Sequence, residues 1–141
     1  MDAIEAIMTR RSIRKYTDTP ITDDQVKQIL SAAMAAPTAG NQQAWEFVVI
    51  TDRKVLNALP DVHPYSRMLL KAPAAVLVCG NLETETKEGY FPQDCAAATQ
   101  NILLAANALG LGAVWLGVHP REERVTGIRK LLRIPDHVVP V

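Results

Sequence analysis

The sequence predicts one domain of the mixed α/β class, in which helices alternate with short buried strands. The chain is 141 residues long, a length typical of a single domain. Short continuous apolar runs, as expected for buried strands, lie between longer segments whose apolar residues recur at helical spacing. Neither a repeated unit nor a low-complexity segment interrupts this alternation. We therefore expect residues 1–141 to fold as one α/β unit.

The first two predicted helices begin at capping patterns. Asp2 is followed by Glu5 at the spacing of a capping box. The apolar stripe of this helix consists of Ile4, Ile7 and Met8. A second helix begins at the sequence from Thr22 to Gln25 and must end before Pro37. Its apolar face repeats at helical spacing and consists of Val26, Ile29, Leu30 and Ala33.

The later elements follow from the same patterns. Strands are predicted at the continuous apolar runs Phe47–Ile50, Ala74–Cys79 and Ala113–Leu116. Shorter helices are predicted over Asp52–Ala58, Tyr65–Lys71 and Arg121–Arg133. The longest helix, Pro92–Leu109, is apolar almost all round, so we expect it in the centre of the fold or at a subunit interface. Gly110 is placed to be its C′ residue, and His137 to Val141 is typical of the entry to a further strand.

The overall composition excludes some classes of partner. With 15 basic and 15 acidic residues, the chain has no basic surplus, so neither nucleic acid nor a membrane is an expected partner. No signal-peptide pattern follows Met1 and no apolar stretch is long enough to span a bilayer, so we expect a cytoplasmic protein. Cys79 and Cys95 lack metal-ligand or disulfide spacing and are expected to be buried apolar residues.

Positive charge is nevertheless concentrated in one segment, because four of the six residues from Arg10 to Lys15 are cationic. If the chain is extended there, Arg10, Ser12 and Arg14 share a face. If it is helical, the two arginines still share a face. Converging guanidinium groups suit a phosphate or a carboxylate. The same pattern is typical of a solvated basic turn that neutralises the C-terminal dipole of the preceding helix.

Two other segments have the composition of a ligand-binding backbone. The loop from Pro37 to Gln43 contains one glycine and three amide side chains, and its N–H groups suit the edge of a flat heterocycle. A plain polar turn would have the same composition. Leu116-Gly117 follows a predicted strand, where glycine either lets the backbone approach a planar ligand or simply makes a turn.

The chain shows no nucleophile or metal site of its own. It contains no Ser/His/Asp or Cys/His pattern and no glycine-rich phosphate loop. Its histidines are scattered, at His63, His119 and His137, and we expect none of them to ligate a metal. Glu122 and Glu123 are explained by a helix N-terminus. No side chain is a candidate catalytic group, so any chemistry must come from a bound cofactor.

Three separated motifs resemble the nitroreductase family of FMN-binding oxidoreductases. The first is Arg10 to Arg14 after a short helix, and the second is the sequence from Ala36 to Phe47. The third is the Ala-rich helix from Asp94 to Leu109 with the Gly110 to Gly117 segment after it. Ile134-Pro135 before a final strand also fits, so the resemblance covers essentially the whole chain in order.

The resemblance implies an α+β fold, a mixed α/β sandwich with a central sheet flanked by helices, that works as an intertwined homodimer with two FMN sites at its interface. Arg10 and Ser12 would hold the FMN phosphate, with Arg11 assisting. Arg14 would lie against the pyrimidine edge of the flavin ring, and Leu116 and Gly117 would approach its reactive nitrogen. The opposite subunit would supply Pro37, Thr38, Ala39 and Asn41.

The function that the resemblance implies is ping-pong hydride transfer from NADH or NADPH, through FMN, to a small electron-poor acceptor such as a nitroaromatic or a quinone. Two alternatives stay open. One is a flavin-consuming or dehalogenating relative of the same fold, although such relatives have longer lid insertions than Asn81 to Tyr90. The other is a non-catalytic flavin or anion sensor, or a basic-turn module for nucleic acid.

The chain departs from the family pattern in two places. Ala44 stands where the family usually has proline before the tryptophan, which loosens that loop. Family members also usually continue into a last strand and a tail that wraps the partner and donates a Lys or Arg to the phosphate. We expect the given sequence to lack this C-terminal part.

Overall fold

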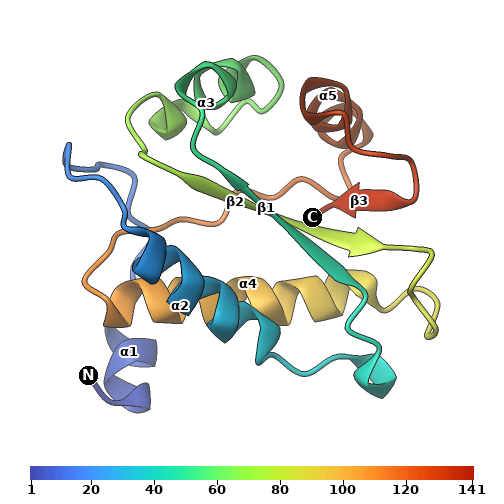
Figure 1. Ribbon diagram of the computed structural model, residues 1–141, viewed down its shortest axis with the longest axis horizontal. Coiled ribbons are helices and arrows are strands. Elements are labelled where there is room, and N and C mark those ends of the chain that lie inside the picture. Colours follow the sequence, from blue (N-terminus) through green and yellow to red (C-terminus); the bar gives the residue numbers. More distant parts are fainter.

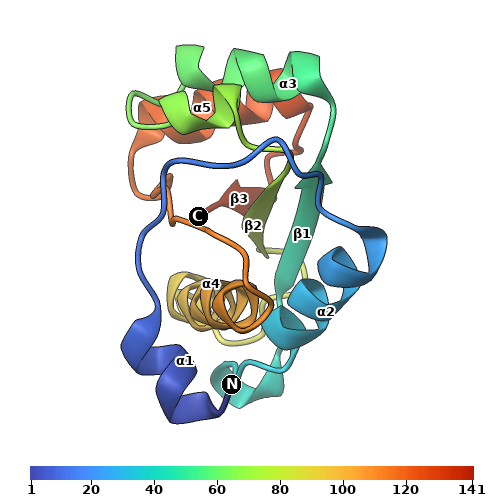
Figure 2. The ribbon, with the colours of Figure 1, turned by 90° about the vertical axis from the view of Figure 1, so that its left-hand side faces the viewer.

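The computed structural model describes residues 1–141 and has three layers, with a small sheet between two layers of helices (Figure 1, Figure 2). The sheet consists of β1 (Trp45–Ile50), β2 (Ala75–Asn81) and β3 (Val138–Pro140). Its two faces are covered by α2 (Asp23–Met34) with α4 (Phe91–Ala108), and by α3 (Arg53–Ala58) with α5 (Glu122–Leu132). Three short 3-10 turns complete the chain, at Ala39–Asn41, Leu59–Asp61 and Arg67–Leu70. The predicted mixed sandwich is confirmed.

The first helix, α1 (Ala3–Thr9), lies outside these layers, against the C-terminal half of α4 (Figure 2). The Asn107 side chain of α4 holds it there, because its amide donates to the Ala6 carbonyl (3.0 Å) and to the Thr9 hydroxyl (2.9 Å). The contact fixes the place from which the cationic segment after α1 departs.

β2 is the central strand of an antiparallel sheet with the order β1-β2-β3. It pairs with the whole of β1. β3 pairs only with Cys79 to Asn81, and Val141 adds one bond from its N–H to the Val78 carbonyl (2.9 Å). The part of β2 before Val78 therefore has no strand partner on this side. We refer to it as the open edge of β2.

Two of the predicted strands are confirmed, and so is the prediction that a further strand begins after His137. The fourth predicted strand is wrong. β1 and β2 form where Phe47–Ile50 and Ala74–Cys79 predict them, and β3 forms in the segment from His137 to Val141. Ala113–Leu116 forms no strand; it makes one parallel bridge, in which the Ile13 N–H donates to the Ala113 carbonyl (2.9 Å). These four residues line a cavity instead. An apolar run indicates that its side chains are covered by other residues, and in this segment they are covered although the backbone pairs with no strand.

β1 is less buried than its apolar sequence predicts. Glu46 is exposed and the Val49 side chain is 36% exposed, so burial on both faces is a wrong prediction for this strand. In β2, by contrast, every residue from Leu77 to Asn81 is buried. The difference arises because the helices cover the middle of the sheet, and β1 lies at its margin (Figure 1).

β2 separates the apolar interior into two clusters. Since successive side chains of a strand point to opposite faces, a strand covered on both faces needs apolar residues at every position. On the α3 and α5 side, Leu77 and Cys79 pack in a cluster that includes Ile50, Leu56, Leu59, Val125 and Ile128. On the α2 and α4 side, Val78 packs in a cluster that includes Ile29, Ala33, Cys95, Ala98 and Ile102.

Capping explains where the main helices begin and end. Thr22 and Gln25 form the complete capping box of α2, whereas at α1 only half of the box forms, with Asp2 accepting the Glu5 N–H (2.9 Å). Gly110, with φ +73°, ends α4 in a Schellman motif, as its predicted C′ role requires. The predicted helices at Asp52–Ala58, Pro92–Leu109 and Arg121–Arg133 are confirmed within one residue at each end.

The predicted helix over Tyr65–Lys71 is wrong in type, because the segment forms a 3-10 turn over Arg67–Leu70. Pro64 and Pro73 confine it to a few residues, and short segments favour the tighter i to i+3 bonds. None of the helices combines the length and the apolar character that crossing a bilayer requires.

The two cysteines are buried and unpaired, as predicted. Cys79 belongs to the cluster on the α3 and α5 side and Cys95 to the cluster on the α2 and α4 side. Burial raises the pKa of each thiol to about 12, and nearby acidic groups act in the same direction. Both thiols therefore stay protonated in the folded protein over the ordinary pH range.

Gly80 leaves room for the ring that begins α4, so we predict that Gly80→Ala destabilises the domain. A Cβ at this position would collide with the Phe91 ring, and overpacking of this kind costs about 1–3 kcal/mol. Urea unfolding monitored by circular dichroism measures the loss. Gly117→Ala is the control, because a Cβ there meets nothing within 4 Å. Equal stability of the two variants would contradict the prediction.

The buried thiols predict a fall in stability at alkaline pH. Their folded pKa lies above the unfolded value of 9.0, so the stabilisation is complete below about pH 9 and is lost as the pH rises towards about 12. Urea unfolding across this range should show a steeper fall for the natural chain than for a Cys79→Ala, Cys95→Ala variant. Parallel curves would show that the thiols contribute nothing.

Candidate functional site

The cationic segment after α1 is extended. The backbone leaves the helix at Arg10 with φ −53° and ψ 135°, and Ser12 forms the parallel bridge with Ala113. Alternation along an extended chain places Arg10, Ser12 and Arg14 on one side, as one of the two predicted geometries requires. The side chains of Arg10 and Arg14 make no hydrogen bond or ion pair within the chain, so both guanidinium groups are free for an anion.

Arg11 has a different environment from its neighbours. Its Nη1 donates to the carbonyls of Met8 (2.9 Å) and Arg10 (2.8 Å), at the C-terminal end of α1. This is the helix-dipole role that the sequence offered as the alternative for the whole segment. The segment therefore divides by residue: Arg11 completes α1, while Arg10 and Arg14 stay unpaired.

Tyr16 packs behind this segment and donates its hydroxyl to the Ile13 carbonyl (2.8 Å). Partial burial raises the pKa of Tyr16, and the positive charge of Arg14 opposes the rise. The positive charge of Arg14 therefore favours a negative charge beside the Tyr16 ring.

The loop from Thr38 to Gln43 is braced from within. Gly40, Asn41 and Gln43 all have positive φ, and the Thr38 hydroxyl accepts the Gln43 N–H (3.1 Å). The N–H groups of Asn41 and Gln42 donate to carbonyls of the loop itself. The loop thus offers fewer free donors than its sequence indicates, because the Gln43 side-chain amide also donates within the loop, to Asn41 Oδ1 (2.8 Å).

Asp94, in the first turn of α4, anchors this loop. Its carboxylate, only 5% exposed, accepts the Ala39 N–H (2.9 Å) and the Gln42 side-chain amide (2.6 Å). The side-chain amide oxygen of Gln42, Oε1, in turn accepts the N–H groups of Thr86 and Lys87. The helix N-terminus favours a negative charge at Asp94. Sequence reasoning named Asp94 only as the start of a helix; the one signal for its role was a carboxylate in an otherwise apolar helix.

Gly117 is bound by other residues at its carbonyl and is open to solvent at its N–H and Cα. Its carbonyl accepts hydrogen bonds from His63 Nε2 (2.8 Å) and Arg124 Nη1 (3.0 Å). Its N–H has no partner, the residue is exposed, and no atom lies within 4 Å of the position a Cβ would take. The open side suits the close approach of a flat ligand, which is one of the two roles that the sequence allows for Leu116-Gly117.

The three groups of predicted residues do not meet within one chain. The Arg10 to Arg14 segment lies by the C-terminal end of α4, which Asn107 ties to α1, whereas the Thr38 to Gln43 loop is bonded to Asp94 at the other end. Asp94 and Asn107 are roughly 20 Å apart, because the helix rises about 1.5 Å per residue. Only the Arg10 to Arg14 segment and the Gly110 to Gly117 segment run side by side, through the bridge at Ser12.

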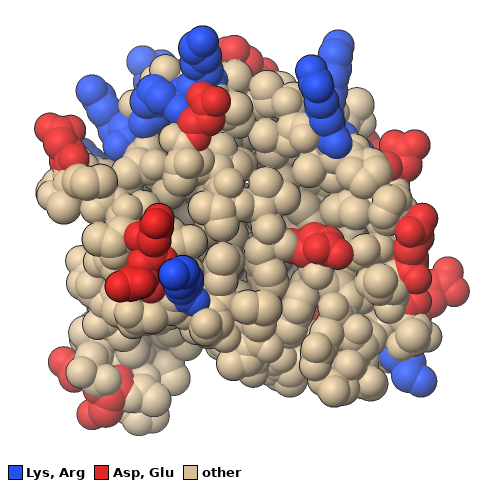
Figure 3. Space-filling view, in the orientation of Figure 1, with Lys and Arg blue, Asp and Glu red and all other residues tan.

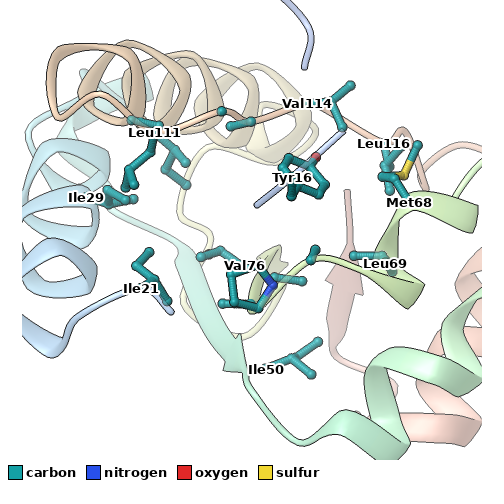
Figure 4. Close-up of a pocket in the computed structure, with 18 of the residues that line it drawn as sticks. Tyr16, Ile21, Ile29, Ile50, Met68, Leu69, Val76, Leu111, Val114 and Leu116 are labelled. Atoms are coloured by element: carbon teal, nitrogen blue, oxygen red, sulfur yellow. The ribbon is translucent and has the colours of Figure 1, made fainter. Parts of the chain in front are cut away.

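A large cavity is a separate feature. It has a volume of about 540 Å³ and is lined mostly by apolar side chains from the N-terminal segment, α2, β2 and the Leu111 to Leu116 segment (Figure 4). Of the ten predicted cofactor residues, only Leu116 lines it. One wall is the open edge of β2. Val76 directs its peptide groups to the same side as Val78, because alternate residues of a strand share an edge.

Charge on the surface is mixed. In Figure 3, Lys and Arg side chains stand over the α3 and α5 layer, and acidic side chains are scattered among and below them. This face shows no continuous basic stripe of the kind that binds a nucleic-acid backbone. No group of three or more His, Cys, Asp or Glu side chains is arranged to hold a metal ion.

Comparison with known proteins decides the family. The model of the nitroreductase family matches residues 7–67 and 60–141, nearly the whole chain. The chain belongs to the nitroreductase family. A Methanothermobacter thermautotrophicus protein provisionally named NADH dehydrogenase/NAD(P)H nitroreductase is 51% identical over 140 residues, which cover 99% of this chain and 73% of that protein. The resemblance carried by the three sequence motifs is thus confirmed.

Solved structures of other nitroreductases agree with the fold. A provisionally named NADH dehydrogenase/NAD(P)H nitroreductase from Parabacteroides distasonis is 42% identical, with a TM-score of 0.93, and the match covers 98% of this chain and 81% of that one. A provisionally named nitroreductase from Desulfovibrio desulfuricans, solved in complex with FMN, is 37% identical, with a TM-score of 0.85, covering 97% of this chain and 80% of that one.

We predict that Asp94→Asn loosens the Thr38 to Gln43 loop of this nitroreductase. The substitution removes the negative charge and replaces one of the two acceptor oxygens by an NH2 group, and the loss of such a bond costs about 1–3 kcal/mol. Hydrogen exchange at the Ala39 amide should accelerate, and urea unfolding should show the loss of stability. Asp24→Asn is the matched control, because Asp24 lies in the first turn of α2, is exposed and makes no long-range bond. Unchanged exchange at Ala39 would refute the anchoring role.

Proposed function

We propose that this nitroreductase-family chain is an FMN-dependent oxidoreductase that uses NADH or NADPH to reduce small electron-poor acceptors, such as nitroaromatics or quinones, in a ping-pong cycle. The observation that carries the proposal is the extended Arg10 to Arg14 segment beside Gly110 to Gly117. It places two unpaired guanidinium groups and a hydroxyl next to a backbone with an open face. The FMN complex of a relative with the same fold supports this choice of cofactor.

The residues fit the chemistry of FMN. A phosphate monoester suits the donors of Arg10 and Ser12, with the remaining guanidinium nitrogens of Arg11 assisting. Arg14 brings a fixed positive charge to the pyrimidine edge of the ring, where negative charge collects on reduction. Leu116 and Gly117 give the ring an apolar contact and a backbone N–H. FMN, when bound, supplies the hydride acceptor and donor that the protein side chains lack.

The remaining contacts are proposed to come from a second copy of the chain. Pro37, Thr38, Ala39 and Asn41 lie at the far end of α4 from Arg10, so a homodimer is the arrangement in which they contribute to the same site. The outer face of α1 supports the proposal, because Ile4, Ile7 and Met8 are each more than half exposed. An apolar face of this kind is typical of a surface that a partner covers. The proposed location remains the cytoplasm.

The visible spectrum of the purified protein mixed with FMN tests the function. We expect a yellow complex that NADH or NADPH bleaches and that a quinone or a nitroaromatic recolours, turnover after turnover. A protein that leaves added FMN free in solution would eliminate the proposal. Bleaching without turnover on any acceptor would favour a sensor.

We predict that Arg10→Ala weakens the retention of FMN by about 1.5–3 kcal/mol, the worth of one charged hydrogen bond. Quenching of FMN fluorescence on binding measures the dissociation constant. Arg67→Ala is the control, because Arg67 is exposed and makes no side-chain bond. Equal affinity in the two variants would remove Arg10 from the site.

A further inference from the structure

His63 and Arg124 converge on a single backbone atom, the Gly117 carbonyl oxygen. A carbonyl oxygen has two lone pairs, and the two donors, at 2.8 and 3.0 Å, occupy both. The carbonyl can accept nothing further, while the Gly117 N–H remains without a partner on an exposed residue. The Gly117–Val118 peptide group is therefore held from inside the protein, while the Gly117 N–H, on the preceding peptide group, is left for a ligand.

The state of His63 follows from its second bond. Its Nδ1 accepts the backbone N–H of Tyr65 (3.2 Å), so the proton of the neutral ring is assigned to Nε2, which donates to Gly117. The ring is 4% exposed, and the hydroxyl of the equally buried Ser66 donates to the His63 carbonyl (2.9 Å). The imidazole is thus a buried hydrogen-bond donor whose orientation is fixed by its second bond, to Tyr65.

Arg124 lies where helix formation does not favour it. It belongs to the first turn of α5, the positive end of the helix dipole, and it has no carboxylate partner. Its guanidinium carbon is 5.3 Å from the centre of the Tyr65 ring, and its buried Nε has no hydrogen-bond partner. Breaking a local rule of helix composition in this way is typical of a residue that serves a site.

We infer that His63 and Arg124 are positioning residues for the flavin, which hold Gly117 by its carbonyl so that the free N–H of the same residue meets the ring. The inference rests on the proposed function, because it assigns Gly117 to the ring of FMN. His63 acts only through Gly117. Arg124 acts through Gly117 and also adds a positive charge on the side of the reactive nitrogen, in the same field as Arg14 at the pyrimidine edge.

Hydrogen exchange without cofactor tests the first half of the inference. His63→Leu removes the donor while keeping an apolar side chain of similar size, and His63→Gln restores an N–H donor. We expect faster exchange of the buried Val118 amide, which shares a peptide group with the Gly117 carbonyl, in His63→Leu and in Arg124→Gln, and a return towards the natural rate in His63→Gln. Unchanged exchange in both would overturn the inference, whatever FMN does.

Binding and potential test the second half. We expect His63→Leu and Arg124→Gln each to raise the dissociation constant of FMN roughly tenfold, as the loss of one hydrogen bond predicts. Arg124→Gln should also lower the midpoint potential of the bound flavin, because a positive charge is removed from beside the reduced ring. A merely structural role would not move the potential.

Arg53→Gln is the matched control for these variants. Arg53 also donates to backbone carbonyls, those of Leu69 and Ala72, on the same side of the sheet but without contact to Gly117. It should leave affinity and potential unchanged. Natural affinity and potential in a His63→Leu, Arg124→Gln double variant would overturn the inference while the proposed function stands. A natural chain that binds no FMN would overturn both.

Discussion

The packing of β2 between two helical layers is the constraint on which the rest of the domain depends. Its side chains supply apolar contacts to both clusters, and its backbone carries the ladders to β1 and β3. α4 is fixed by this packing, and α4 in turn holds α1 through Asn107 and the Thr38 to Gln43 loop through Asp94. The candidate site is thus positioned indirectly. The groups that hold it belong to α4, and α4 is packed against β2.

Much of this arrangement could be predicted from the sequence, because it depends on local signals. The capping box at Thr22, the continuous apolar run of β2 and Gly110 after α4 each determine their structure within a few residues. The failures are non-local. Ala113–Leu116 has the composition of a strand, but a ladder needs a neighbouring backbone, and only Ser12 supplies one. β1 loses its expected burial because of its place in the sheet.

The candidate site divides in the same way. The Arg10 to Arg14 segment is evident as a local excess of charge. The helix-dipole role was an alternative for the whole segment, and nothing in the pattern indicated that Arg11 alone takes it while its neighbours stay free. Asp94, His63 and Arg124 were missed as site residues for a common reason. Asp94 and His63 act on partners 52 to 55 positions away, and Arg124 acts on a backbone oxygen rather than on another side chain. No spacing in a single sequence reports such contacts.

The open edge of β2 also determines what the large cavity tolerates. Its walls are mostly aliphatic, yet the peptide groups of Val76 face into it, and unpaired backbone groups are costly to strip of water. A purely hydrocarbon occupant would contact the side chains but would leave the peptide groups of Val76 without hydrogen-bond partners. Water or an extended peptide segment would satisfy the hydrogen bonds of these peptide groups. The hydrogen-bonding pattern of an occupant therefore matters as much as its volume, although most of the lining side chains are apolar.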